Sequence, residues 1–231
     1  RHYPGHFTKR GRRMFESWLR AAGKARRVLC PSQATANDLR IAGIPDDRIL
    51  VIPLGVDLVK ASVDLVESLR FRYQLDGPVI LWLGVAEPRK NLARIVESMT
   101  AVPVASLVIA GNPGWSVNLE SMAAPLGGRI RLVGPVDDEE KRAWYALADV
   151  FAFPSLLEGF GLPVLEAMAQ GTPVVTTSST ATAEIVGKAG ILVEPDDVVS
   201  LTEAIRHLIE DTREASRLST EGLSLIHISE P

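Results

Sequence analysis

Residues 150–175 read VFAFPSLLEGFGLPVLEAMAQGTPVV. An apolar run from Val150 to Phe153 leads into a loop with two glycines, then a helix-compatible segment, and a second apolar run follows Pro173. A short strand, a helix and another short strand make one βαβ unit, in which the two strands are parallel. This stretch therefore predicts an α/β fold.

The same alternation extends along the chain on both sides of this stretch. Short apolar runs, each followed by helix-compatible sequence, begin near Val79, Ala105, Arg129, Val150, Pro173 and Ile191. This spacing suits right-handed βαβ crossovers, and strands of this kind form a parallel sheet covered on both faces. We therefore expect residues 61–222 to form a doubly wound parallel-sheet domain of the Rossmann kind, which binds ligands at the carboxyl ends of its strands.

Two further strand-like runs, 27–30 and 49–52, precede this domain. Ser32 follows the first run and is a good N-cap for a helix that continues to about Ala42. Pro53 to Gly55 follow the second run, and a new helical pattern begins near residue 61. We therefore expect a linker at 53–60, with residues 1–52 in a separate unit.

The composition excludes several classes of protein. The chain has 231 residues, of which 46% are hydrophobic and 23% are charged, as in globular proteins. Its net charge of −3 provides no overall basic field, so we expect no nucleic-acid partner. Cys30 is the single cysteine, which excludes an internal disulfide and fits a reducing, cytoplasmic compartment.

The distribution of histidines excludes most hydrolytic chemistry. The four histidines are His2, His6, His207 and His227, whereas a Ser-His-Asp triad, a Cys-His pair or a zincin helix needs one in the central part of the chain. The sequence also lacks a P-loop and lacks G-x-G-x-x-G after a strand. The apolar stretch 79–86 is too short to span a membrane.

The N-terminal segment is strongly basic. Residues 1–27 contain nine Lys and Arg residues and one acid, Glu16. Met14, Phe15, Trp18 and Leu19 recur within it at helical spacing, which predicts an amphipathic helix. Such a helix either packs on a sheet or binds an anionic membrane surface through the basic residues of 9–27.

A first candidate site follows the strand 79–83. Gly84 ends this strand, and Arg89 and Lys90 stand directly before a helix for which Asn91 is a good N-cap. The helix dipole disfavours cations at this end, unless an anion lies between them and the free amides. We expect the charge of Lys90 to be exposed, and a solvated surface pair is the alternative interpretation.

A second candidate site follows the strand 150–153. Glu158 lies in the glycine-containing loop, and Pro163 fits the first position of the next helix, with Glu166 in its first turn. We expect the amides of Phe160 to Leu162 to point toward the strand ends and both carboxylates to face one pocket. The alternatives are a loop charge at Glu158 and a dipole-favoured surface acid at Glu166.

The two sites together suit one class of ligand. A pair of cations and free helix amides suit a diphosphate, and a carboxylate can accept two hydrogen bonds from the vicinal hydroxyls of a sugar or ribose. A sugar nucleotide carries both groups.

Specific motifs resemble one enzyme family. Glu158 and Glu166 reproduce the Glu-x7-Glu motif of retaining glycosyltransferases of family 4 (glycosyl transferases group 1, GT-B fold), and residues 154–175 resemble that family throughout. The segments IPLGVD (52–57), LGVAEPRKNL (83–92), IAGNPGW (109–115) and VGPVDDEEKRAWYALADVFAFPS (133–155) resemble it as well. The resemblance covers about residues 25 to 215.

The resemblance implies a domain organisation. A GT-B enzyme has two Rossmann-like domains with the active site between them. By this comparison, residues 61–222 resemble the complete nucleotide-sugar-binding domain, and residues 1–52 resemble a remnant of the acceptor-side domain. We therefore expect a truncated chain that is inactive in isolation. After Gly222 the helical pattern breaks, so we predict a non-native tail at 223–231.

The resemblance also implies residue roles. Lys90 would hold the donor diphosphate, Arg89 would assist it in place of an arginine that the family often has at the position of Val85, and Glu158 would contact the transferred sugar. Glu166 would bind the ribose of the nucleotide, and Val136 lies where the family contacts the base. The donor-binding residues implied in this way are Gly84, Val136, Phe160, Gly161, Leu162 and Glu166.

The implied activity is that of a hexosyltransferase in polysaccharide biosynthesis. It would move mannose or glucose, with retention, from a donor such as GDP-mannose or UDP-glucose to a glycan or lipid-linked acceptor. The sequence has no Asp-x-Asp pair, in agreement with a transfer that requires no metal. The resemblance implies a front-face path, and a covalent intermediate on a carboxylate, as in retaining hydrolases, is the alternative. We expect the protein in the cytoplasm, at the inner face of the membrane.

Two alternatives belong to other classes. One is a sugar-nucleotide-binding module without catalysis. The other is a non-hydrolysing sugar-nucleotide epimerase, and the combination of Glu158 and Glu166 with Arg89 and Lys90 argues against it.

Overall fold

The computed structural model describes residues 8–114 and 118–227 and confirms the α/β prediction. Its larger sheet has six strands in the order β5-β4-β3-β6-β7-β8, and every neighbouring pair is parallel. The strands are β3 (Val79–Leu83), β4 (Ser106–Ala110), β5 (Ile130–Gly134), β6 (Val150–Phe153), β7 (Val174–Thr177) and β8 (Ile191–Val193). Each of the six apolar runs in the sequence is therefore a strand.

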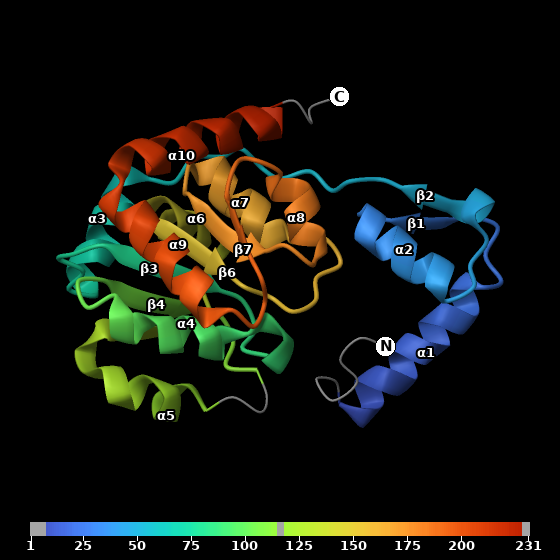
Figure 1. Ribbon diagram of the computed structural model, residues 1–231, viewed down its shortest axis with the longest axis horizontal. Helices are drawn as coiled ribbons and strands as arrows, with labels where there is room; N and C mark the ends of the chain where they lie inside the picture. Colours follow the sequence, from blue (N-terminus) through green and yellow to red (C-terminus); the bar gives the residue numbers. More distant parts are fainter. Residues whose placement is uncertain (1–7, 115–117, 228–231) are drawn as a thin grey trace.

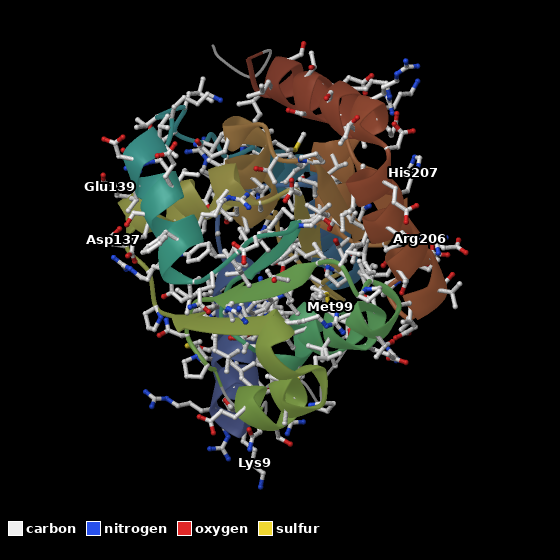
Figure 2. The ribbon with its side chains drawn as sticks, turned by 90° about the vertical axis from the view of Figure 1, so that its left-hand side faces the viewer. Lys9, Met99, Asp137, Glu139, Arg206 and His207 are labelled. Atoms are coloured by element: carbon white, nitrogen blue, oxygen red, sulfur yellow. The ribbon has the colours of Figure 1, made fainter. Side chains whose placement is uncertain are left out.

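Helices cover both faces of this sheet. They are α3 (Val63–Arg72), α4 (Leu92–Ser98), α5 (Leu119–Ala123), α6 (Asp138–Leu147), α7 (Leu162–Gln170), α8 (Ala181–Val186), α9 (Val198–Glu210) and α10 (Thr212–His227). Helix α6 contacts α3 and α7 on one face, while α4 and α9 contact each other on the opposite face. In Figure 2, Asp137 and Glu139 at the start of α6 accordingly lie on the other side of the molecule from Arg206 and His207 of α9.

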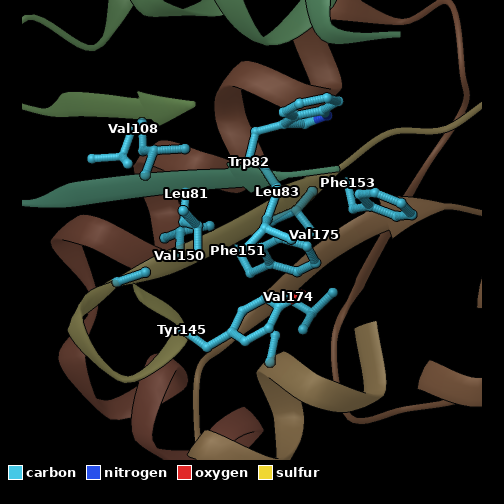
Figure 3. Packing of buried hydrophobic residues seen from close by; sticks show 14 of the residues in the cluster. Leu81, Trp82, Leu83, Val108, Tyr145, Val150, Phe151, Phe153, Val174 and Val175 are labelled. Carbon is cyan, nitrogen blue, oxygen red and sulfur yellow. The ribbon is translucent and has the colours of Figure 1, made fainter. Parts of the chain in front are cut away.

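The core lies between the two layers of helices. All residues of β3, β6 and β7 are buried, because a parallel sheet covered on both faces needs continuous apolar strands. Figure 3 shows Tyr145 of α6 directed toward Phe151, and the two rings meet edge to face with centroids 5.2 Å apart. Full burial of one such side chain contributes about 1.5–3 kcal/mol to folding.

The strand order creates one crevice at the carboxyl edge of the sheet. The chain runs from β3 outward through β4 to β5 and then returns to β6 on the other side of β3. The loops after β3 and β6 therefore leave the sheet in opposite directions and open a crevice between them, which is the ligand site of such sheets.

The N-terminal part is a smaller unit, drawn in blue in Figure 1. It contains α1 (Lys9–Ala22), β1 (Val28–Cys30), α2 (Gln33–Ile41) and β2 (Ile49–Val51), and the two strands pair in parallel. Its core is separate and is formed around Cys30, Ala36, Ile44 and Ile49. The predicted cap of α2 is confirmed, since Ser32 Oγ accepts a hydrogen bond from Thr35 N.

Helix α1 keeps most of its apolar side chains at the surface, and Ala22 at its end packs against the smaller core. Among the described residues it contributes no buried side chain, and Met14, Phe15 and Trp18 are exposed. The interpretation of this helix as one packed on a sheet is therefore wrong for the described part of the chain, since the two-stranded sheet is covered by α2. The other interpretation, membrane contact, stays a prediction. No helix in the described ranges is long and apolar enough to cross a membrane.

The predicted linker is irregular but fixed. Lys60 Nζ donates a hydrogen bond of 2.7 Å to Ala169 O at the end of α7. Gln170 donates to Val59 O and accepts from Ala61 N. These contacts hold the segment between β2 and α3 against the last turn of α7.

The end of the chain differs from the prediction. The expected break in the helical pattern after Gly222 is wrong, because α10 continues to His227. Leu218 and Ile226 are buried in the larger hydrophobic core, and α10 contacts α7 and α9. This packing maintains α10 where the sequence pattern weakens. Residues 228–231 of the predicted tail lie outside the described residues.

Candidate functional site

The loop after β3 is held close to its neighbour. Ala86 N donates a hydrogen bond of 2.9 Å to Asn112 O in the loop after β4. A Cβ atom at Gly111 would overlap Gly84 O, and one at Gly114 would overlap Ala86 O. Glycines at these two positions therefore allow the loops to pack together and fix Gly84, the first predicted site residue. Trp115 of the family-like segment lies outside the described residues.

Lys90 and Glu158 meet in the crevice between β3 and β6. Lys90 Nζ lies 2.5 Å from Glu158 Oε1 and 4.6 Å from the centroid of the Phe153 ring. Burial lowers the pKa of Lys90, and the charge and hydrogen bond of Glu158 partly offset this effect. The expectation of an exposed Lys90 is therefore wrong, because the turn Pro88–Lys90 directs its side chain inward beneath Glu158.

Arg89 completes a compact group of four charges. Its Nε lies 2.7 Å from Glu87 Oε2, and its Nη1 lies 3.6 Å from Glu158 Oε1. The same Nη1 donates a hydrogen bond to Leu157 O. Two cations and two carboxylates leave the group formally neutral. An incoming anion must therefore compete with Glu158 and Glu87 for Lys90 and Arg89.

Asn91 does not cap α4 as expected. It lies in the left-handed region, at φ 56° and ψ 31°, whereas an N-cap residue is extended. Its Nδ2 instead donates a hydrogen bond of 2.8 Å to Pro195 O, in the loop after β8. The tight turn that positions Lys90 ends at Asn91 and imposes this backbone conformation.

The loop after β6 ends at Gly161, which precedes α7. Gly161 has φ +113°, and a Cβ atom there would lie 2.5 Å from Thr182 Cγ2. Within the described part of the chain, the amides of Phe160, Gly161 and Leu162 donate no hydrogen bond. Free amides at a helix N-terminus favour an anion, as the sequence predicts for this loop.

Glu166 lies in a second group of side chains. Helix α7 begins at Leu162, so Pro163 is its second residue and Glu166 lies beyond the first turn, against the prediction. Glu166 accepts hydrogen bonds from Lys141 Nζ, at 2.8 Å, and Tyr145 Oη, at 2.9 Å. Burial, together with the charge of Glu166, raises the pKa of Tyr145 well above its ordinary value.

A small cavity of about 170 Å³ lies beside this second group. It is lined by Val56, Asp57, Asp138, Lys141, Arg142, Tyr145, Glu166 and Gln170. Asp57 comes from the linker, which therefore contributes to the site. The structure thus brings Glu158, Lys90 and Arg89 together and places Glu166 with Lys141 and Tyr145.

Val136 lies in the loop between β5 and α6, two residues before Asp138. It follows Gly134 at the carboxyl end of β5, the edge strand two places from β3, and it is half-buried. No group of three or more His, Cys, Asp or Glu side chains in the described ranges could hold a metal ion.

Sequence reasoning did not select three residues of these groups: Glu87, Lys141 and Tyr145. Glu87 stands two residues before Arg89, a spacing that brings the two charges together in the tight turn. Lys141 and Tyr145 are four residues apart on α6 and therefore share one helix face. The sequence contains this helical spacing, but it does not show which face of α6 contacts Glu166.

Two parts of the chain match models of glycosyltransferase families. Residues 77–211 match the family model described as glycosyl transferases group 1, and residues 1–60 match the model described as glycosyltransferase family 4. The O-antigen chain mannosyltransferase B of Escherichia coli is 31% identical over 95% of this chain and 61% of its own length. An MMP alpha-(1->4)-mannosyltransferase of Mycolicibacterium hassiacum is 32% identical over 90% of this chain and 51% of its own length.

Solved structures share the fold. The Anabaena protein HepE, crystallised in complex with UDP and glucose, superposes with a TM-score of 0.87 at 23% identity, over 97% of this chain and 64% of that one. WaaG, a glycosyltransferase involved in lipopolysaccharide biosynthesis, gives a TM-score of 0.81 at 19% identity, over 96% of this chain and 65% of that one. The chain thus spans about half to two thirds of the length of these proteins. By its match over residues 77–211, the chain belongs to the glycosyl transferases group 1 family.

Proposed function

We propose that this chain binds a nucleotide-diphosphate sugar in the crevice between β3 and β6 and acts in retaining hexosyl transfer. The observation that carries the proposal is the group of Lys90, Arg89 and Glu158 beside the free amides that begin α7. A diphosphate matches these cations and amides in charge and in hydrogen-bonding capacity.

The relatives support the nature of the donor. The two curated relatives are named as mannosyltransferases, and the HepE structure contains UDP and glucose. On this basis the donor is a hexose nucleotide of the GDP-mannose or UDP-glucose type. The acceptor is a glycan or a lipid-linked sugar.

The proposed chemistry relies on electrostatic stabilisation by the protein. Cleavage of the bond between the sugar and the diphosphate leaves negative charge on the diphosphate. Lys90 and Arg89 stabilise this charge after they separate from their carboxylate partners. Glu158, released from Lys90, then contacts the transferred sugar. In this front-face scheme the leaving phosphate accepts the proton of the acceptor hydroxyl, and no metal ion is required.

The remaining residues bind the nucleotide in the same proposal. Glu166 accepts hydrogen bonds from the ribose, and Val136 contacts the base. The loop backbone at Gly84 and the amides of residues 160–162 contact the phosphates and the sugar. Residues 61–222 are then the donor domain, and residues 1–52, joined by the linker 53–60, contribute to the acceptor side.

Calorimetric titration of the chain with GDP, UDP, GDP-mannose and UDP-glucose tests this proposal. We expect one nucleotide and its sugar derivative to bind, and Lys90→Met to abolish that binding. Lys188→Met, at an exposed position that belongs to neither group of site residues, is the matched control and should retain the affinity. Equal binding by wild type and Lys90→Met would refute the phosphate role.

The same titration, followed by an assay for sugar transfer, distinguishes a hexosyltransferase from a sugar-nucleotide-binding module without catalysis. Glu158→Gln is expected to lower turnover more than donor affinity. Donor binding without any transfer to glycan or lipid-linked acceptors would instead indicate a sugar-nucleotide-binding module.

A further inference from the structure

The N-terminus of α2 is bound by two acceptors of the larger unit. The carboxylate of Glu184, on α8, accepts hydrogen bonds from Gln33 N at 2.8 Å and from Ala34 N at 2.5 Å. The carbonyl oxygen of Gly159 accepts one from Ser32 Oγ at 2.7 Å and one from Thr35 Oγ1 at 2.8 Å. Four hydrogen bonds therefore converge on the first turn of one helix.

Gly159 links this contact to the candidate site. It directly follows Glu158, the carboxylate paired with Lys90, so its carbonyl belongs to the backbone that positions Glu158. Two hydroxyl groups of the smaller unit hold that carbonyl from one side. Removal of one hydroxyl takes away one of the two hydrogen bonds to the peptide group next to Glu158 and changes no charged group of the site.

Helix α8 supports the same loop from the other side. Thr182, two residues before Glu184, lies against Gly161, and its hydroxyl bonds those of Thr176 and Thr180 at 2.8 and 2.7 Å. Thr177 Oγ1 donates a hydrogen bond of 2.7 Å to Ser155 O at the start of the loop. The loop 155–161 therefore contacts both α2 and α8, and the carboxylate of Glu184 hydrogen-bonds these two helices to each other.

The charge of Glu184 suits this position. A carboxylate at a helix N-terminus accepts hydrogen bonds from orphan amides and interacts favourably with the helix dipole. In most helices the cap comes from the same chain segment, and Ser32 already supplies that local cap for α2. Glu184 adds an acceptor from 150 residues away in sequence, which fixes the smaller unit against the larger one.

We propose that Glu184 is a positioning residue: by holding the N-terminus of α2, it places Ser32 and Thr35 on Gly159 and thereby fixes the loop of Glu158. The contact itself does not depend on which ligand the crevice binds. Only its effect on donor affinity rests on the proposed function.

Residue-resolved amide hydrogen exchange on the whole chain tests this proposal. We expect Glu184→Gln, which keeps the shape but removes the charge, to raise exchange at Gln33 and Ala34 about tenfold, as for the loss of a helix cap. The same variant should raise exchange across residues 155–161. Thr35→Val should raise exchange at 155–161 but leave Gln33 and Ala34 protected, because it removes only the bond to Gly159.

A control variant and a reference segment distinguish the proposed effect from general destabilisation. Glu203→Gln, at an exposed acid of α9, should change neither segment. Exchange in β3 reports the stability of the whole core and should stay at the wild-type value in all variants. A rise in β3 equal to that at 155–161 would show general destabilisation and would overturn the proposal.

Two further outcomes show whether the contact between Glu184 and α2 affects the loop 155–161. Faster exchange at Gln33 and Ala34 with an unchanged loop 155–161 would reduce Glu184 to a helix cap and overturn the proposal. Where the wild type binds a nucleotide, Glu184→Gln and Thr35→Val should weaken that binding to a similar degree. If the wild type binds no nucleotide, the proposed function fails, while the exchange data still decide the role of Glu184.

Discussion

At the scale of single residues, the ion pair of Lys90 and Glu158 combines a stability cost with the binding role that we propose for it. Their side chains are 10% and 9% exposed, so both charges lose most of their hydration. Removal of one partner from a buried pair leaves the other charge uncompensated, whereas replacement of both by neutral groups is often tolerated. The buried pair is therefore expected to contribute little net stability, in agreement with the proposed role in ligand binding.

The variant Lys90→Met is therefore expected to lower the free energy of unfolding by about 3 kcal/mol. Arg89 remains 3.6 Å from Glu158 and limits the loss. The double variant Lys90→Met/Glu158→Gln should regain most of the stability but bind no donor. Urea unfolding followed by circular dichroism measures both effects, and a double variant no more stable than Lys90→Met would contradict the argument.

Gly161 is the second residue whose identity is dictated by its surroundings. Its positive φ and the nearby Thr182 Cγ2 both oppose a side chain, so Gly161→Ala should cost about 1–3 kcal/mol. The additional substitution Thr182→Ser removes the opposing methyl group and keeps the hydroxyl. It should restore only the part of the lost free energy of unfolding that is due to the contact between Cβ and this methyl group. Thermal unfolding of the single and double variants gives this partition. Full recovery would show that backbone strain contributes nothing.

At the scale of elements, carboxylates cap several helices and make stability depend on pH. Asp197, the N-cap of α9, accepts hydrogen bonds from Ser200 Oγ at 2.6 Å and Ser200 N at 2.9 Å. The hydrogen bond from the Ser200 hydroxyl, and to a smaller extent that from the Ser200 amide, lowers the pKa of Asp197 below its ordinary value of 3.8.

A lowered pKa in the folded state fixes the direction of the pH effect. The stabilisation by Asp197 is complete above its unfolded-state pKa and is lost as the pH falls through the lower folded-state value. Asp197→Asn keeps an acceptor but does not titrate, so the difference in melting temperature between wild type and variant should shrink from pH 6 to pH 3. Asp76→Asn, at an exposed loop position, should show no such convergence.

The order of elements was predictable, but several of their ends were not. The strands were found because each is a short apolar run, and each must be apolar since both faces of the sheet are covered. The side chain of Asn91 bonds Pro195 O, more than a hundred residues away, instead of capping α4, and no local pattern contains that contact. The burial of Lys90 likewise depends on Glu158, and the continuation of α10 depends on packing beneath Ile226.

At the scale of the whole molecule, α10 connects the end of the chain to its core. It contacts both α7 and α9 and lies across the larger unit, as the red helix in Figure 1 shows. Met168 of α7 lies against Gly222, where a Cβ atom would be 3.3 Å from its methyl group. This helix therefore helps to cover the element that carries Glu166.

Ile226→Ala tests that contribution. Because Ile226 is 5% exposed, the truncation should lower the free energy of unfolding by about 2–4 kcal/mol. Ser224→Ala, at an exposed position of the same helix, should have little effect. Chemical denaturation of both variants measures the difference, and equal stability would show that the end of α10 is not part of the core.

The molecule has two hydrophobic cores with no buried residue in common among those described. The larger is formed by the sheet that carries the donor candidates, and the smaller by β1, β2 and α2. In evolutionary terms, a substitution in one core leaves the packing of the other unchanged, so each unit can diverge at its own rate. Recombination at the linker then exchanges one unit for another, provided that the new partner still presents hydroxyl groups to Gly159 and amides to Glu184.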